Sequence, residues 1–364
     1  MPALSLPLER YISDPRLLPL ADKVRRQERL SFEDGLLLYE SPDLTGIGAM
    51  AHSERLRRHG LKTYYVVSRR LSYTNICYTH CQFCAFQAKP DDPRAYVLSA
   101  DDILRELEKP ENTGVRELHM VAGHYPKLKI EYFEDLFRQL KARFPDLHLK
   151  VFTMVEMDYY ARASGLSVEA FLDRCVAAGL ESCPGGGAEI FDEELRAKIC
   201  IGKKDANVWL EVAELCHRKG IPTNCTILYG HIEEPRHRVD HLLRLRALQD
   251  RTGGFLAYIP LAYQIEDNEL GREYPIFETT GHLAQVLDNV PHIKAYWVMI
   301  GEGQAQIGLN YGADDMDGTI IEETIAHDAG ATTPQALSKG ELQRLISEAG
   351  FEPLERDNLY KIYS

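Results

Sequence analysis

The stretch Asn75-Ile-Cys-Tyr-Thr-His-Cys-Gln-Phe-Cys-Ala-Phe86 places three cysteines within one short segment. Three residues separate Cys77 from Cys81, and two residues separate Cys81 from Cys84. Cysteine thiolates are the ligands that iron–sulfur clusters use, and three of them from one loop can hold three irons of a cubane [4Fe–4S] cluster. The fourth iron then stays open, as the coordination shell of a catalytic metal does. The spacing therefore predicts a [4Fe–4S] cluster with one iron free for a ligand.

A structural zinc site is the alternative interpretation, and it would make the chain a non-catalytic metal-binding protein. Tetrahedral zinc needs a fourth ligand, and no second cysteine pair follows at zinc-ribbon spacing. His80 directly precedes Cys81, so its imidazole would have difficulty reaching a metal that the flanking cysteines already hold. The cluster is therefore favoured. The remaining cysteines are interpreted as small buried hydrophobic residues without a ligand role: Cys175, Cys183, Cys200, Cys216 and Cys225.

Composition indicates an ordinary globular protein. The 364 residues are 45% hydrophobic and 27% charged, which allows a sizeable core and argues against disorder or a fibrous repeat. A net charge of −13 argues against a nucleic-acid partner, which would require a basic surface. We find neither a signal-peptide pattern nor a run of 18 apolar residues, and the eight cysteines show no disulfide framework. We therefore expect a cytoplasmic protein without a membrane partner.

From Lys62 onward, short runs of strand-forming residues alternate with amphipathic helical stretches, which are 100–107, 132–144, 168–178, 206–219 and 238–250 among others. Such alternation is typical of βαβ units with a parallel sheet. The count of strand-like runs is eight, so we predict an α/β fold, a (β/α)8 barrel of the TIM type. The predicted strands are 63–67, 117–121, 150–155, 180–183, 223–228, 255–260, 294–300 and 312–318.

Helical patterns frame the predicted barrel on both sides. Residues 1–60 are predicted to form an N-terminal helical segment, with Ser31 capping one helix and Gly60 ending another. The barrel itself is predicted over 61–327. The C-terminal tail, 328–364, contains one helix pattern that Gly350 ends, and we expect it to pack against the outside of the barrel.

Unusual residues gather where the predicted strands end. In (β/α)8 barrels the active site lies at the C-terminal ends of the strands, in the loops that follow them. The cysteine loop follows the first predicted strand, and Gly123 and His124 follow the second. The run Pro184-Gly-Gly-Gly-Ala-Glu189 follows the fourth, and His231 follows the fifth. We therefore expect these residues to meet at one mouth of the barrel.

Several of these residues have both a structural and a functional interpretation. The glycine run could form a tight turn, or it could let the backbone approach a ligand closely, with Glu189 gripping ribose hydroxyls. Gly123 has the same two interpretations. The aspartates in Gly312-Ala-Asp-Asp-Met-Asp-Gly318 either cap the last barrel loop or reach substrate hydroxyls.

The cysteine spacing, with Phe83 before the last cysteine, resembles the radical S-adenosylmethionine (SAM) superfamily. Over about residues 30–360, the chain also resembles the aminodeoxyfutalosine synthase (aminofutalosine synthase) family of the futalosine-dependent menaquinone pathway. The most specific block is Ser182-Cys-Pro-Gly-Gly-Gly-Ala-Glu-Ile-Phe-Asp192. The further blocks are 153–156, 198–200, 228–233, 241–255 and 312–319.

This resemblance implies that SAM is a co-substrate. Its methionine amine and carboxylate would chelate the open iron, and one electron would release a 5'-deoxyadenosyl radical. The resemblance further implies that Phe83 and Gly123 belong to the SAM site, that Glu189 binds the ribose, and that Lys203 lies near the methionine carboxylate. It implies an electron donor such as flavodoxin or ferredoxin as partner.

The implied substrate is a small molecule, 3-[(1-carboxyvinyl)oxy]benzoate. The radical would add to the enol-ether CH2, the aryl group would move, and a carboxylate would be lost to give 6-amino-6-deoxyfutalosine. Two related enzymes remain open as alternatives, the radical SAM cyclase of the same pathway and the synthase of the deazaflavin cofactor's core, both of which abstract hydrogen.

An acidic protein must supply local positive groups or donors for a substrate with two carboxylates, because burying such a dianion without partners is very costly. The candidates at the strand ends are Arg69, or failing it Arg70, with His119, His124 and His231. Each histidine is also a candidate for an ordinary structural role. We expect one firm arginine contact, and one histidine facing the carboxylate that departs.

Overall fold

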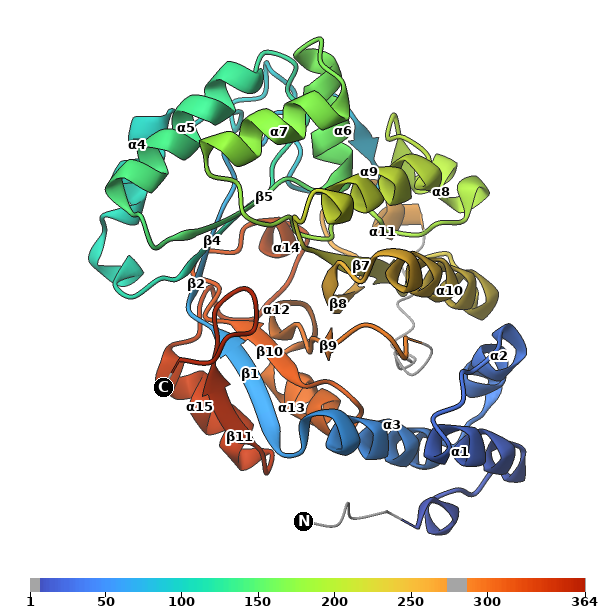
Figure 1. The fold of residues 1–364 in the computed structure, drawn as a ribbon. Helices are drawn as coiled ribbons and strands as arrows, with labels where there is room; N and C mark the ends of the chain where they lie inside the picture. Colours follow the sequence, from blue (N-terminus) through green and yellow to red (C-terminus); the bar gives the residue numbers. More distant parts are fainter. Residues whose placement is uncertain (1–6, 274–286, 364) are drawn as a thin grey trace.

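The computed structural model describes residues 7–273 and 287–363, and its main strands form a closed parallel ring (Figure 1). β1 (Lys62–Val66) continues almost directly into β2 (Ser68–Leu71). β1 pairs with β10 (Asp315–Gly318), and β2 pairs with β4 (Glu117–Met120). One nearly continuous strand thus joins two sections of the ring.

The rest of the ring follows the order of the sequence. β4 pairs with β5 (His148–Val151), and isolated bridges through Ser182 and Cys183 connect β5 to β7 (Thr223–Tyr229). β7 pairs with β8 (Phe255–Ala262), β8 pairs with β9 (His292–Ile293), and a bridge from Lys294 to Asp315 returns to β10. All of these pairings are parallel, so the predicted barrel fold is confirmed.

Helices cover the outside of the ring (Figure 1). Several begin with side-chain caps: Ser99 and Ser167 accept bonds from backbone N–H groups at the starts of α4 and α7. The predicted bounds of these two helices match the structure. The outer helices are α4 (Ala100–Leu107), α5 (Ile130–Arg143), α6 (Met154–Ala163), α7 (Val168–Ala178), α8 (Glu193–Ile199), α9 (Ala206–Arg218), α10 (Pro235–Thr252) and α13 (Glu302–Asn310).

The N-terminal helices pack against one side of the barrel. They are α1 (Leu18–Arg25), α2 (Phe32–Glu40) and α3 (Leu44–His59), and they enclose a small apolar cluster of their own. α2 lies beside α10, and α3 lies beside α13 (Figure 1). Ser31 forms a capping box with Asp34, as the sequence predicted a cap there. No helix among residues 7–273 and 287–363 has the length and apolar character needed to cross a bilayer.

The C-terminal tail enters the barrel instead of lying only outside it, so that expectation was wrong. The predicted helix is present as α15 (Lys339–Glu348), but β11 (Glu352–Glu355) then adds a parallel strand beside β1. Beyond β11, Arg356 bonds Asp315, and Asn358 accepts a bond from Lys150. The tail thus closes the end of the barrel at which the strands begin. The division at 60/61 and 327/328 stays a prediction.

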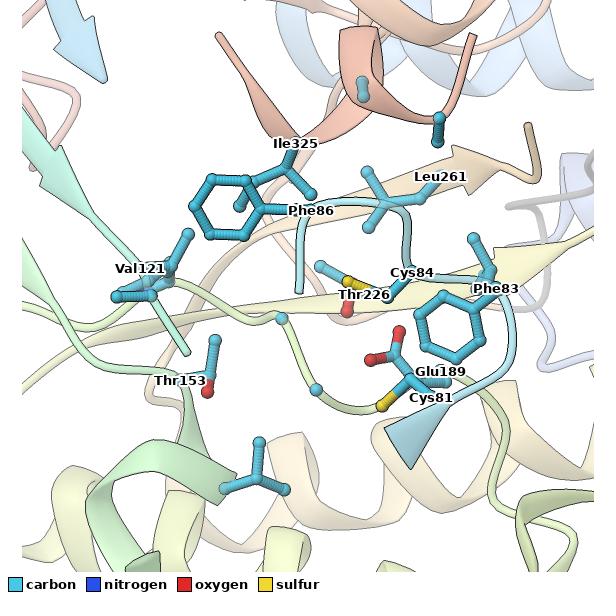
Figure 2. Close-up of a pocket in the computed structure, with 18 of the residues that line it drawn as sticks. Cys81, Phe83, Cys84, Phe86, Val121, Thr153, Glu189, Thr226, Leu261 and Ile325 are labelled. Atoms are coloured by element: carbon cyan, nitrogen blue, oxygen red, sulfur yellow. The ribbon is translucent and has the colours of Figure 1, made fainter. Parts of the chain in front are cut away.

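The predicted strand 294–300 is wrong beyond Lys294. After β9 and the Lys294 bridge, the chain turns into α12 (Trp297–Ile300), which ends at Gly301 with φ of 81°. Short apolar runs do not distinguish a buried strand from a buried helix. α14 (Ile325–Asp328) comes after the ring and covers its mouth, as Figure 2 shows for Ile325. α11 (Glu269–Glu273) is a short helix in the loop after β8.

Candidate active site

A cavity of about 250 Å³ opens at the C-terminal ends of the strands. Cys77, Cys81 and Cys84 all line it. Figure 2 shows Cys81 and Cys84 at this cavity, together with Phe83 and the carboxylate of Glu189. The cysteine loop and the glycine run 185–187 therefore line the same cavity, as expected from the sequence.

Backbone bonds hold the cysteine loop in place. The N–H of Cys77 donates to Ala88 O at 3.0 Å, and the side-chain amide of Gln87 donates to the carbonyls of Cys81 and Cys84. β3 (His80–Cys81) pairs antiparallel with β6 (Cys200–Ile201). These contacts come from several parts of the chain, so the thiols are presented by a braced loop.

The thiols fit three corners of a cubane cluster. They converge on one cavity, and no nearby acid or histidine in the described residues completes a zinc set with them. A hydrogen bond with the Cys200 thiol lowers the pKa of Cys81 to about 6, although burial opposes this shift. The positive charge of Lys203 lowers the pKa of Cys81 further. A thiolate is the form that binds metal. Sequence reasoning missed the position of Cys200 because the β3–β6 pairing is non-local.

Steric contact explains why Gly123 is a glycine. A Cβ at this position would lie 2.3 Å from Ile76 O and 3.1 Å from the Cβ of Cys77. The next residue, His124, donates its N–H toward Cys77 Sγ at 3.4 Å, and its carbonyl accepts from Tyr78. Segment 122–124 is thus packed directly against the cysteine loop, and Gly123 also lines the cavity.

The glycine run has a similar explanation. A Cβ on Gly185 would lie 2.5 Å from Asn224 O, and one on Gly187 would lie 2.4 Å from Val155 Cγ2. These glycines are therefore required by contact with neighbouring strands and loops. They line the cavity as well, so their backbone groups remain available to a ligand.

Glu189 and Lys203 form a buried ion pair at the cysteine end of the cavity. Lys203 Nζ lies 2.8 Å from Glu189 Oε1, and the ammonium lies 5.4 Å from the centre of the Phe83 ring. Although burial opposes the charge, Cys81 and Glu189 hold the pKa of Lys203 well above its usual range. Glu189 has φ of 48°, a left-handed conformation that is uncommon for a non-glycine residue. The pair offers one acceptor and one cation beside the thiols.

Replacing Glu189 with glutamine should weaken SAM binding. The amide keeps the shape of the side chain but loses the charge of the acceptor that is predicted to bind a ribose hydroxyl. We expect a loss of about 1–3 kcal/mol, the range for a hydrogen bond to a charged group. Calorimetric titration of the cluster-loaded protein with SAM measures this. Unchanged SAM affinity would leave Glu189 with only its structural pairing to Lys203.

Arg69 does not reach the cavity, so the structure does not support its predicted contact with substrate. Both arginines lie within β2, and successive side chains of a strand point to opposite faces. Arg69 faces outward and forms ion pairs with Glu106, at 2.8 Å, and with Glu322. Arg70, the second choice, lines the cavity.

Two of the three predicted histidines line the cavity. His119 stands opposite Arg70 in the β2–β4 register, and burial, aided by Arg70, lowers its pKa well below the ordinary value. His124 stacks on Tyr159, and burial lowers its pKa to about 3. Both are therefore neutral donors or acceptors. His231 is not among the cavity residues: its ring bonds Leu228 O and the N–H of Ile232, so its expected role is not supported.

Two further residues of the cavity carry no local sequence signal. Tyr296 lines it, with its ring 4.9 Å from the Arg70 guanidinium. Glu156 also lines the cavity, and it accepts hydrogen bonds from the Tyr73 hydroxyl and the N–H of Ala122, each at 2.8 Å. Glu156 therefore fixes the segment that braces the cysteine loop.

Comparison with known proteins agrees with this geometry. A profile of the Radical SAM superfamily matches residues 71–246, and a profile described as the CofH/MqnC C-terminal region matches residues 252–364. The thiol triad at the mouth of a parallel barrel therefore defines a radical SAM enzyme. Its cofactor is a [4Fe–4S] cluster, and SAM is its co-substrate.

Curated relatives narrow the class. The chain is 46% identical to aminodeoxyfutalosine synthase of Thermus thermophilus, covering 97% of each chain. It is 44% identical to the enzyme of that name from Streptomyces coelicolor, covering 94% of this chain and 93% of the relative. Cyclic dehypoxanthine futalosine synthase of the same Streptomyces is 37% identical, covering 95% and 88%. The chain belongs to the aminodeoxyfutalosine synthase family.

Solved structures support the fold. Methylornithine synthase (PylB) superposes with a TM-score of 0.72 at 15% identity, covering 92% of this chain and 97% of that one. The hydrogenase maturase HydG superposes with a TM-score of 0.70 at 15% identity, covering 95% and 78%. At such low identity the agreement concerns the barrel alone.

Proposed function

We propose that the protein is an aminodeoxyfutalosine synthase. It joins the 5'-deoxyadenosyl group of SAM to the enol-ether CH2 of 3-[(1-carboxyvinyl)oxy]benzoate. The aryl group moves from oxygen to carbon, the enol carboxylate leaves, and 6-amino-6-deoxyfutalosine is formed. The identity of 46% to a synthase of this name over nearly the whole chain carries the proposal. The cavity supports it, because the three thiols and the Arg70 guanidinium, a cation for a carboxylate, line the same chamber.

The cysteines Cys77, Cys81 and Cys84 would hold the cluster, which when bound supplies the electron that cleaves SAM. Glu189 would bind the SAM ribose, and Lys203 would face the methionine carboxylate. Phe83 and Gly123 would form the walls beside them. The protein's further contribution is to hold the substrate in a chamber without water, since water and stray side chains quench organic radicals.

Arg70 and His119 would bind the substrate. They are paired across β2 and β4, and both line the cavity. Arg70 binds Asp317 of β10 and lies against the Tyr296 ring, whereas the Glu189–Lys203 pair acts on Cys81. Arg70 would therefore serve the part of the cavity beside β10 and Tyr296. His124, whose N–H lies 3.4 Å from Cys77 Sγ, would face the enol carboxylate that leaves.

Replacing Arg70 with methionine should raise the substrate KM while reductive SAM cleavage continues. Methionine replaces the aliphatic stem of the side chain but removes the guanidinium and its charge. Loss of a charged hydrogen bond of about 2 kcal/mol corresponds to roughly a 30-fold change. Steady-state kinetics with both substrates measures this. Arg69→Met is the matched control, because Arg69 faces outward. An equal KM for Arg70→Met and the wild type would refute the assignment.

Product analysis tests the proposed function directly. The cluster-loaded protein is incubated anaerobically with a chemical reductant, SAM and the enol-ether benzoate, and the products are read by mass spectrometry. A covalent adduct with the mass of aminodeoxyfutalosine is expected. Free 5'-deoxyadenosine with no adduct would indicate a hydrogen-abstracting enzyme instead.

The electron donor and location are also part of the proposal. Reductive SAM cleavage needs a one-electron donor of low potential, such as flavodoxin or ferredoxin. All eight cysteines of the chain are free thiols, which suits a reducing compartment. We therefore assign the protein to the cytoplasm.

A further inference from the structure

Asp317, in β10, binds two buried cations at once. Lys294 Nζ lies 2.6 Å from one carboxylate oxygen, and Arg70 Nη2 lies 2.9 Å from the other. The side chains of Lys294 and Asp317 are 2% and 5% exposed. Although burial alone would raise it, Lys294 and Arg70 hold the pKa of Asp317 well below its usual range. One carboxylate cannot neutralise two cations, so this group carries an excess of positive charge.

The other acids that act on Arg70 have their own cations. Glu117 lies 3.5 Å from Lys150 Nζ. Glu323 lies 3.7 Å from His327, and hydrogen bonding to Glu323 raises the pKa of His327 to about 9, so His327 is charged at neutral pH. The excess charge therefore stays at Arg70, which faces the cavity.

The backbone holds Asp317 in this bridging position. Its φ of 62° is left-handed, and its N–H donates to Asp315 Oδ1 at 2.5 Å. The other oxygen of Asp315 accepts a hydrogen bond from Arg356 of the C-terminal tail at 2.7 Å. Lys294 binds Asp317 but is not among the residues that line the cavity.

We propose that Lys294 is a positioning residue for substrate binding, acting through Asp317 on Arg70. It neutralises Asp317, so that Asp317 orients Arg70 without cancelling its charge. Arg70 then binds the ring carboxylate of the substrate, because the enol CH2 must reach SAM at the thiol end and the ring carboxylate is the more distant one. This inference rests on the proposed function.

The charge change Lys294→Met tests the inference. Without the ammonium, Arg70 and Asp317 become a closed neutral pair, so the affinity for the enol-ether benzoate should fall about tenfold or more. Calorimetric titration of the cluster-loaded protein, with SAM present and no reductant, measures the Kd. SAM affinity should not change. If Lys294→Met does not fold, Lys294→Gln, which still donates to Asp317, is measured with the same expectation.

A second substitution should rescue binding. In Lys294→Met/Asp317→Asn both charges of the pair are gone, so Arg70 is again an unneutralised cation and the Kd should return to within about threefold of the wild type. A merely structural role for Lys294 predicts no such rescue. Failure of the double variant to recover affinity, while its melting curve is that of a folded protein, would overturn the proposal.

Two comparisons separate this inference from others. An analogue without the ring carboxylate should bind the wild type more weakly and bind Lys294→Met equally weakly. If Lys294→Met weakened the binding of the enol ether and of the analogue by the same factor, Arg70 would not hold the ring carboxylate. The control Arg55→Met removes a buried charge from α3, where Arg55 bonds the carbonyls of Gly60 and Lys62, and it should leave the substrate Kd unchanged; an equal loss there would overturn the role of Lys294. If the wild type does not bind the enol ether, the proposed function itself fails.

Discussion

Alanine in place of Cys77, Cys81 or Cys84 should abolish cluster assembly and activity. The three thiols line one cavity, and a cubane with only two protein thiolates is expected to be labile or absent. After anaerobic reconstitution, each variant should show little iron, little sulfide and no visible iron–sulfur absorbance. Reductive cleavage of SAM should fall to background. We expect these losses to be the largest of any single substitution that leaves the fold intact.

Other buried cysteines provide the controls. Cys175 and Cys216 are fully buried in the main apolar core, and Cys216 contacts Met157 Sδ at 3.8 Å. Their alanine variants should keep full iron content and lose only stability, by about 1 kcal/mol for a small cavity. Cys200→Ser is the sharper comparison, since Cys200 faces Cys81. If Cys200→Ser lost iron as completely as Cys81→Ala, a fourth cysteine ligand would have to be accepted.

Local sequence signals were enough to predict much of the fold. Helices α4 and α7 begin after serine caps and were predicted with their correct bounds, because caps and amphipathic spacing act within a few residues. The cysteine loop was equally clear, because its spacing alone carries the ligand set. Strand order followed from alternation, since right-handed βαβ connections place successive strands side by side.

Features that depend on a shift of one residue were not predictable in this way. The first predicted strand ended before Arg69, whereas the structure continues into β2 and so decides by alternation that Arg70 faces inward. Similarly, the apolar residues after Lys294 form the helix α12 instead of a strand. Its residues Trp297 and Val298 are buried in an apolar cluster that α13 and α15 complete. Neither outcome has a local signal.

Buried charges were the hardest to predict. Asp317 meets Lys294 and Arg70, which lie 23 and 247 residues away in the sequence. Such contacts exist only once the ring is closed. In the sequence, the three aspartates of the run 312–318 were equally compatible with capping a loop and with binding the substrate. In the structure Asp314 accepts the N–H of Ile293, and Asp315 pairs with Arg356, so both serve the protein itself.

Alanine at Gly123 should disrupt the cluster site although Gly123 offers no side chain to it. The new Cβ would lie 2.3 Å from Ile76 O, well inside any real contact, so the cysteine loop or the segment after β4 must move. We expect a loss of roughly 1–3 kcal/mol of stability, typical of overpacking. Iron content after reconstitution should fall with it. Thermal unfolding and iron analysis measure the two effects.

Gly303→Ala is the matched control, because this exposed glycine in α13 has open space where a Cβ would go. Alanine there should be neutral or stabilising by up to about 1 kcal/mol, since glycine is a poor residue within a helix. If Gly123→Ala unfolded like the wild type and kept its iron, the contact with Ile76 would have to be relieved by a movement that leaves the thiols in place. The bracing role of segment 122–124 would then be wrong, and the cysteine loop would have to be positioned by Gln87 and β6 alone.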